Sequence, residues 1–289
     1  MGAALPWLDA SLWACVGLLI GSFLNVVIHR LPRMMEREWA AECAELQINE
    51  AQGKDASPLD ESPPFNLLVP RSRCPDCGHL IAWYENIPLL SYAFLRGRCS
   101  ECGKRISWRY PAVELATGAL FFFCAWTFGP TPEALAWSVF SAALLALACI
   151  DWDTTLLPDN ITQPLLWLGL IAAALQWTPV TLPTALWGAV GGYLSLWSVY
   201  WLFKLVTGKE GMGFGDFKLF AALGAWFGWP VLIPMVLMAS VIGAILGIAM
   251  KFTTGLREGG YVPFGPFLAG AGFAALLLGP EDLRRLLSF

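Results

Sequence analysis

Two aspartates at the ends of apolar stretches are the residues of this chain best suited to do chemistry. Asp151 follows the apolar stretch Ser141–Ile150, and Asp216 follows the glycine-rich stretch Gly211–Gly215. Two carboxylates about 3 Å apart share one proton near neutral pH. The ionised one can then take a proton from water while the other polarises a carbonyl. If the fold brings the two together, they can hydrolyse a bond as the pair of an aspartic protease does.

Other catalytic groups are scarce. The chain has no G-x-S-x-G elbow and no H-E-x-x-H motif, and its only histidines are His29 and His79. Asp153 competes with Asp151 for the first catalytic role. We otherwise interpret Asp153 and Asp159 as acids that cap helices or pair with cations such as Lys218.

The elements that must position these acids are membrane helices. The chain has 289 residues, of which 57% are hydrophobic and 14% charged, and its mean hydropathy is +0.58. These values exclude an ordinary soluble domain and favour an all-α polytopic membrane protein. We expect about eight transmembrane helices of roughly 20 residues each, with seven as the alternative. They are expected near residues 10–28, 112–128, 133–150, 161–177, 183–205, 217–233, 235–251 and 263–280.

Lys and Arg set the expected orientation of these spans. Residues 29–111, 204–218 and 251–262 carry 11, 3 and 2 of the 18 basic residues, and all three segments fall on one side of the membrane. The positive-inside rule places that side in the cytoplasm. We therefore expect a first transmembrane helix over residues 1–28, a cytoplasmic segment over 29–111 and a transmembrane catalytic core over 112–289. Both aspartates then lie at the cytoplasmic face, at the same depth.

The glycines before Asp216 indicate an irregular loop. Without a Cβ, Gly211, Gly213 and Gly215 permit unusual dihedral angles and close approach to another backbone. Within the cytoplasmic segment, Met34 to roughly Gly53 is rich in Glu, Ala and Leu and is expected to form a helix.

The cytoplasmic segment also contains two C-x-x-C-G turns, whose glycines let the backbone fold tightly. The pairs are Cys74 with Cys77 and Cys99 with Cys102, separated by 21 residues. Four thiolates in tetrahedral array form a closed, structural zinc site. Disulfides are the alternative, but a cytoplasmic location is reducing. His79 is a further possible ligand, although four thiolates already suffice. Segment 29–111 contains 11 basic and 11 acidic residues, so it has no excess of positive charge to bind a phosphate backbone. No nucleic-acid partner is therefore expected.

Several motifs together resemble those of the type IV prepilin peptidases, the bifunctional leader peptidases and N-methyltransferases of bacterial inner membranes. The second aspartate lies in a G-x-G-D signature that this family shares with presenilin-like proteases. The similarity extends over almost the entire chain. It is carried by Gly21–Pro32, the tetracysteine segment, Glu85–Pro88, Arg109–Pro111, Val113–Leu115, the stretch Ile150–Asp159 and the stretch Gly213–Leu219.

The resemblance implies Asp151 and not Asp153 as the first catalytic residue, and Asp216 as the second. It implies substrates that are type IV prepilins or secretion pseudopilin precursors, each with a short basic leader before an apolar helix in the lipid. It also implies S-adenosylmethionine as methyl donor. The donor site is unknown from the sequence, because no strand–GxGxxG–helix unit is present. Glu114 is a candidate for orienting the substrate amine, although a helix-start acid favoured by the dipole is the alternative.

Two other classes of protein remain as alternatives. A cation- or proton-coupled transporter would use paired acids near the bilayer midplane and broken helices in a repeat. Here the acids lie at span ends and no internal repeat is seen. A zinc-ribbon membrane anchor would leave the glycine-rich loop before Asp216 unexplained.

Overall fold

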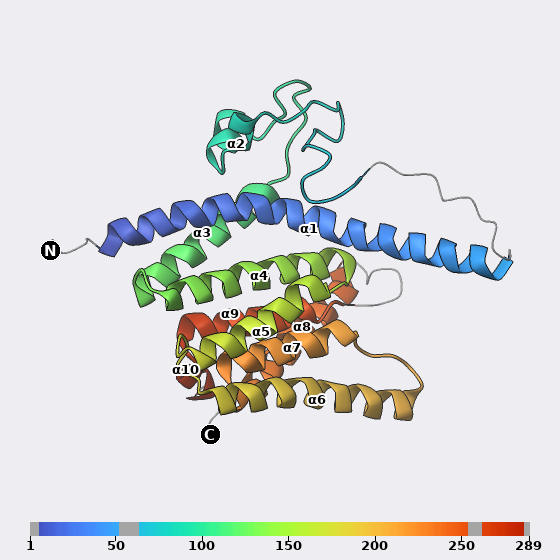
Figure 1. Ribbon diagram of the computed structural model, residues 1–289, viewed down its shortest axis with the longest axis vertical. Coiled ribbons are helices and arrows are strands. Elements are labelled where there is room, and N and C mark those ends of the chain that lie inside the picture. Colours follow the sequence, from blue (N-terminus) through green and yellow to red (C-terminus); the bar gives the residue numbers. More distant parts are fainter. Residues whose placement is uncertain (1–5, 52–63, 254–261, 286–289) are drawn as a thin grey trace. The chain divides into compact units, whose positions relative to one another are not determined.

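The computed structural model describes residues 6–51, 64–253 and 262–285, and within them the regular elements are all helical. The expected all-α membrane fold is therefore confirmed. In these described parts of the chain, two short 3-10 helices, η1 (Trp83–Asn86) and η2 (Trp229–Val231), accompany ten α-helices (Figure 1). The α-helices are α1 (Pro6–Ala51), α2 (Leu90–Phe94), α3 (Arg109–Phe128), α4 (Pro132–Thr154), α5 (Asp159–Ala174), α6 (Leu182–Thr207), α7 (Phe214–Phe227), α8 (Leu232–Thr253), α9 (Gly265–Leu278) and α10 (Pro280–Arg285).

Eight helices coincide with the eight expected spans, but they differ in length. By length and composition, α1, α3, α4, α6 and the combined η2–α8 helix can cross a membrane. Helices α5, α7 and α9 have 16, 14 and 14 residues. The expected sixth span, 217–233, ends early because Gly228 adopts a left-handed φ of 77° and stops α7. Pro234 lies inside the first turn of α8, where proline is tolerated.

The first helix is longer than expected. The sequence predicts a span ending near residue 28 and a separate helix from Met34, but α1 runs without interruption for 46 residues and contains Pro32. The strong helix formers that follow Met34 therefore continue the first helix and do not begin a new one. Gly53, the predicted end of that helix, lies outside the described residues.

The chain divides into two compact units. The core unit holds residues up to Ala14 and from Ala119 onward, and the cysteine unit holds Cys15–Gly118. The division falls inside α1 and α3. The expected boundaries at residues 28 and 111 are sequence-based and stay a prediction.

Within the core unit, α6 and α7 pack backbone against backbone. A Cβ added at Gly192 of α6 would lie 2.7 Å from the Phe220 carbonyl oxygen of α7, and Gly188 and Gly224 face each other across the same interface. Small residues allow this close approach. In lipid, where no hydrophobic effect drives helices together, the resulting van der Waals packing stabilises the interface instead. At the other side of α7, the Trp226 indole N–H donates to the Leu165 carbonyl of α5 at 2.9 Å.

This interface predicts a difference between neighbouring glycines of α6. Gly192→Ala should destabilise the protein by about 1–3 kcal/mol, because the new methyl collides with the α7 backbone. Gly191→Ala is the matched control, since its nearest neighbour would be the Leu232 side chain at an ordinary 4.0 Å. Thermal unfolding in detergent measures both. Equal melting temperatures for the two variants would contradict the close packing of α6 on α7.

Candidate functional site

Asp151 lies in the last turn of α4, in the core unit. Its side chain is buried, with 4% of its surface exposed. The helix ends four residues later at Thr155, whose φ of 58° is left-handed and whose N–H donates to the Asp151 carbonyl at 2.9 Å. The chain then turns through Leu157 into α5. The predicted position of Asp151 at a span end is thus confirmed.

Asp216 lies in the first turn of α7 and is 6% exposed. Its Oδ2 accepts from the Gly213 N–H at 3.2 Å, and its own N–H donates to the Gly213 carbonyl at 3.2 Å. The reciprocal pair caps the helix, and the positive end of α7 favours the carboxylate. Its other oxygen, Oδ1, is buried and has no hydrogen-bond partner among the described residues.

The expectation of unusual dihedral angles in the loop before Asp216 is wrong at Gly213, whose φ is −81°, and neither Gly211 nor Gly215 has a positive φ. The expected close approach is confirmed. A Cβ on Gly215 would lie 2.6 Å from the Cβ of Leu157, and one on Gly211 would lie 2.9 Å from the Phe203 ring. A side chain at Gly211 or Gly215 would collide with its neighbours, so these positions need glycine for close packing and not for a positive φ.

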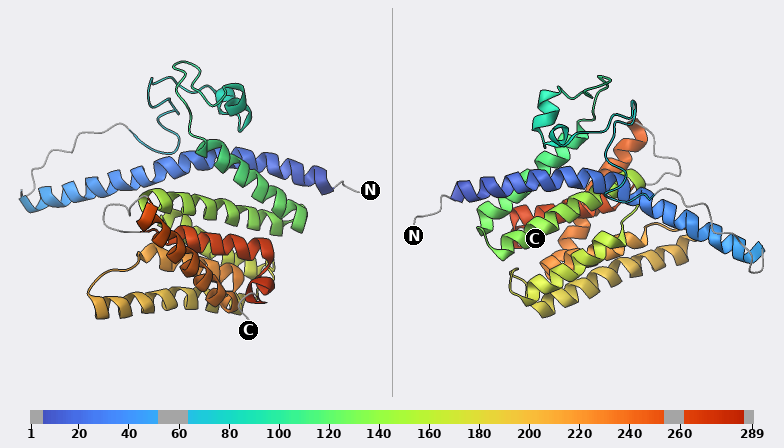
Figure 2. Two further views of the ribbon diagram at one scale, coloured as in Figure 1. Left: turned by 180° about the vertical axis from the view of Figure 1, so that it is seen from behind. Right: turned by 45° about the horizontal axis from the view of Figure 1, so that its top comes forward.

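The two aspartates are brought together by helices other than their own. Helices α5 and α9 each pack against both α4 and α7. In Figure 1 they lie between those two helices, and Figure 2 shows the same group from two further directions. The two carboxylates lie close enough for their charges to interact, although 65 positions separate them in the chain. Two buried carboxylates that repel one another are the arrangement needed for a shared proton.

The other acids of this region have different surroundings. Asp153 is exposed to the surface of the core unit. Asp159 is the first residue of α5 and forms a bidentate ion pair with Lys218 of α7, at 2.7 and 2.6 Å. The predicted pairing with Lys218 is therefore confirmed for Asp159. It ties the start of α5 to the second turn of α7, two residues after Asp216.

In the cysteine unit, the four predicted cysteines form one cluster. Their sulfurs all lie within 4.8 Å of one another, with Cys74–Cys102 and Cys77–Cys99 distances of 3.9 Å. Four sulfurs held tetrahedrally about 2.3 Å from a zinc ion would lie about 3.8 Å apart. The cluster can therefore hold a metal ion.

The two C-x-x-C turns have the same backbone plan. Gly78 and Gly103 have φ values of 75° and 70°, as the tight turns require. Each donates its N–H to the carbonyl of the first cysteine of its turn, at 3.0 Å. The backbone N–H groups of Cys77 and Asp76 hydrogen-bond to the Cys74 sulfur and lower the pKa of that thiol to about 7. The thiolate form that metals bind is thus favoured at Cys74, whereas desolvation and hydrogen bonds with the neighbouring cysteines raise the pKa of the Cys77 thiol to about 12.

His79 is not part of the cluster of ligands. Its Nε2 lies 3.0 Å from Glu85 Oε2, and the Ala82 N–H also donates to that oxygen at 2.8 Å. Hydrogen bonds from Ser100, Ala82 and His79 lower the pKa of the Glu85 carboxyl to about 2. His79 therefore links the first cysteine turn to η1 and has a structural partner.

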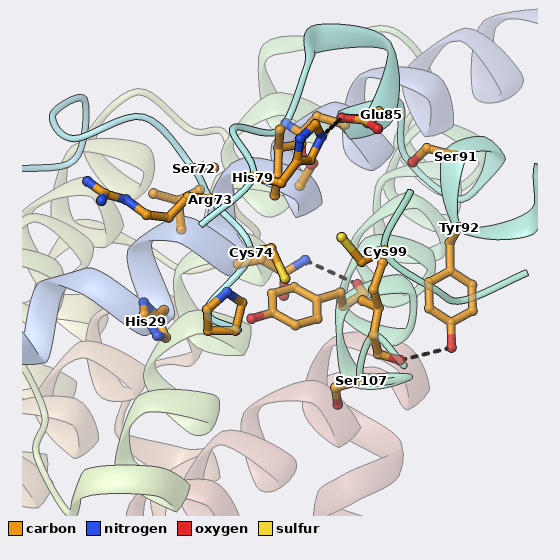
Figure 3. A pocket seen from close by; sticks show the side chains of 18 of the residues that line it. His29, Ser72, Arg73, Cys74, His79, Glu85, Ser91, Tyr92, Cys99 and Ser107 are labelled. Atoms are coloured by element: carbon orange, nitrogen blue, oxygen red, sulfur yellow. Dashed lines mark hydrogen bonds and ion pairs between the residues drawn. The ribbon is translucent and has the colours of Figure 1, made fainter. Parts of the chain in front are cut away.

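The same unit contains a pocket of about 710 Å³. Figure 3 shows His29 of α1 and Cys74, Cys99, Glu85 and Tyr92 among the side chains that line it. The volume falls in the range typical of small-molecule sites. The charged side chains of its lining are mostly basic: Arg30, Arg33, Arg71, Arg73, Lys104 and Arg105, against Asp76, Glu85 and Glu114.

Glu114 lines this pocket and is not a helix-start acid. Helix α3 begins at Arg109, so Glu114 lies in its second turn, and its buried carboxylate accepts the Leu89 N–H at 2.9 Å. Gly21 of α1 packs against it, since a Cβ there would lie 2.7 Å from the Glu114 Cα. The dipole explanation for this acid is therefore wrong, because the helix starts earlier than expected.

Sequence reasoning missed two neighbours of the aspartates. Leu157 packs against Gly215, and Gly265 of α9 packs against both Leu157 and the Asp151 carboxylate. A glycine followed by a proline at the start of an apolar stretch was the signal available in the sequence.

Comparisons with known proteins agree with these two units. The family described as bacterial peptidase A24 N-terminal domain matches residues 15–128, which include the cysteine cluster. The type IV leader peptidase family matches residues 138–248, which include both aspartates. No solved structure matches the chain.

Curated relatives match over nearly the whole length. A prepilin leader peptidase/N-methyltransferase of Pseudomonas aeruginosa is 54% identical over 95% of this chain and 92% of its own. Proteins of the same name from Aeromonas hydrophila and Burkholderia pseudomallei are 51% and 50% identical, over 97% and 96% of this chain and 94% and 88% of their own. Similarity of this extent, over both units, shows that the chain belongs to the prepilin leader peptidase/N-methyltransferase family.

Proposed function

We propose that this protein is a membrane-embedded aspartic endopeptidase that removes the leader from type IV prepilin and pseudopilin precursors. Asp151 and Asp216 are its catalytic pair. The observation that carries this proposal is the burial of both carboxylates, on two helices that α5 and α9 each contact, within the segment matched by the type IV leader peptidase family. The relatives carry the name of the activity. The transporter alternative gains no support from any relative.

The pair works by general acid–base catalysis. The ionised aspartate takes a proton from water as the water oxygen attacks the scissile carbonyl carbon, while the protonated aspartate donates its proton to the carbonyl oxygen. The tetrahedral diol then collapses. Its carbon–nitrogen bond breaks as the leaving nitrogen takes up a proton from the pair. Burial of both carboxylates keeps competing bulk water away from the pair.

The substrate's position follows from the location of the pair at helix ends. Asp151 lies in the last turn of α4 and Asp216 in the first turn of α7. The scissile bond of a transmembrane substrate can therefore reach them when it lies beside the end of the substrate helix. The distribution of basic residues supports a location of these ends at the cytoplasmic face of the bacterial inner membrane. The protein is tested as a peptidase by incubating the purified full chain in detergent with a prepilin precursor and measuring leader release.

The cysteine cluster binds structural zinc in this proposal. Its four sulfurs are spaced as a tetrahedral zinc requires, and four thiolates leave no open position for chemistry. Its effect is to hold the two cysteine turns together.

The second activity is methylation of the new N-terminal amine. S-adenosylmethionine, when bound, supplies a methyl group carried on a sulfonium sulfur. The pocket of the cysteine unit fits a ligand of that size, and its arginines can pair with the carboxylate of the donor's amino-acid end. Glu114, buried in the lining, can accept the proton that the amine must lose before it is methylated.

Glu114→Gln should therefore separate the two activities. The amide keeps an oxygen for the Leu89 N–H but cannot take a proton, so methylation should fall by roughly 10²-fold while cleavage stays near wild type. Mass spectrometry of the processed pilin measures both products. Glu38→Gln is the control, because Glu38 is exposed on α1 and outside the pocket lining. Wild-type methylation by Glu114→Gln would remove Glu114 from this role.

A further inference from the structure

The carboxylate of Asp151 packs against a glycine at the start of α9. Gly265 is buried and is the first residue of that helix. A Cβ at this position would lie 2.5 Å from Asp151 Oδ2 and 3.0 Å from its Cγ. Contacts under 3.0 Å essentially never occur for real Cβ atoms. The carboxylate therefore occupies space that the side chain of any other residue would need.

The backbone does not itself require glycine here. The φ of Gly265 lies outside the left-handed region, and α9 begins regularly, with the Phe264 carbonyl accepting from Phe267 and Leu268. Alanine at this position is compatible with the helix, which it would even favour. What an added methyl would disturb is the space beside Asp151.

Leu157 extends this contact toward the second aspartate. The same Cβ on Gly265 would lie 3.2 Å from Leu157 Cδ1, and a Cβ on Gly215 would lie 2.6 Å from the Cβ of Leu157. Gly215 directly precedes Asp216. One leucine is thus held between two glycines, each of which adjoins or contacts a catalytic carboxylate. The start of α9 therefore contacts Asp151 directly and the residue before Asp216 through Leu157.

We propose that Gly265 is a positioning residue of the peptidase. Because Gly265 has no side chain, it leaves room for the Asp151 carboxylate to lie where it shares a proton with Asp216. This inference rests on the proposed function of the two aspartates. Gly265 lies beyond residues 138–248, the segment matched by the leader peptidase family. Its role comes from its contact with Asp151.

The kinetic test compares two alanine substitutions in α9. Gly265→Ala should lower kcat for leader cleavage by roughly 10²-fold, the effect expected of a displacement of about 1 Å in a catalytic group. KM should stay within about twofold, because Asp151 acts on the reacting bond and not on the rest of the substrate. Gly270→Ala is the matched control, since a Cβ there would meet no atom within 4 Å. A wild-type kcat for Gly265→Ala would overturn the proposal.

The stability test probes the contact between residue 265 and the Asp151 carboxylate without measuring activity. Gly265→Ala should lower the melting temperature of the full protein by roughly 2–4 °C. It should lower it little or not at all in an Asp151→Ala background, because truncation of the carboxylate leaves room for the new methyl. An equal fall in both backgrounds would overturn the proposal, since the methyl would then be colliding elsewhere. Failure of the proposed function would appear separately, as leader cleavage by Asp151→Asn, in which residue 265 is unchanged.

Discussion

Asp151→Asn and Asp216→Asn are each expected to lower the rate of leader cleavage by roughly 10²–10⁴-fold. An amide can neither take a proton from water nor share one with its neighbour, so either substitution removes the whole acid–base pair. For the same reason the double variant should be little worse than either single one, because residues that act as a unit are not additive. Cleavage of a purified prepilin precursor in detergent, followed over time, measures all three.

Folding and chemistry can be separated in these variants. Asn preserves the shape of the side chain, and at position 216 its oxygen can still accept the Gly213 N–H. Because each substitution removes a buried charge, the melting temperature should hold or rise. Asp153→Asn is the matched control, since Asp153 is exposed and lies only two residues from Asp151. Near-wild-type cleavage by either Asp151→Asn or Asp216→Asn would end the aspartic-peptidase proposal.

The second large effect is expected at the cysteine cluster. Structural zinc sites contribute apparent binding energies of about 10–16 kcal/mol to the folding of small zinc domains. Cys74→Ser and Cys102→Ser should therefore each abolish stoichiometric zinc binding and unfold the cysteine unit, one substitution in each turn. Metal analysis of the purified protein gives the first result, and limited proteolysis of residues 64–108 gives the second. Peptidase activity should be lost less readily than the fold of the cysteine unit, because the aspartates belong to the core unit.

A cysteine outside the cluster supplies the comparison. Cys43 is exposed on α1 and takes no part in the group of four, so Cys43→Ser should keep its zinc and its resistance to proteolysis. Full zinc content in Cys74→Ser would contradict the tetrahedral site. Protein that carries no zinc at all, yet resists proteolysis in the cysteine unit, would contradict a structural role for the metal.

The sequence was informative wherever a signal was local. The C-x-x-C-G turns predicted the cluster of Cys74, Cys77, Cys99 and Cys102, because spacing and glycine dihedral angles are properties of a few adjacent residues. The apolar stretches predicted eight of the described helices but not all their ends. Gly228 stops α7 early, and α1 continues past Pro32, because packing and neighbouring propensities decide such boundaries.

The sequence by itself determined the class of the protein: an all-helical membrane protein, a four-cysteine cluster, and two acids at helix ends. Only the tertiary structure decided how those acids meet. Helices α4 and α7 are connected through α5 and α9, and the contacts with Gly265 and Leu157 depend on helices that are distant in the chain. A helix end can be predicted from its own residues, whereas the space beside a buried carboxylate is set by whatever packs there. Gly265 belongs to the second kind, so its contact with Asp151 could be seen only in three dimensions.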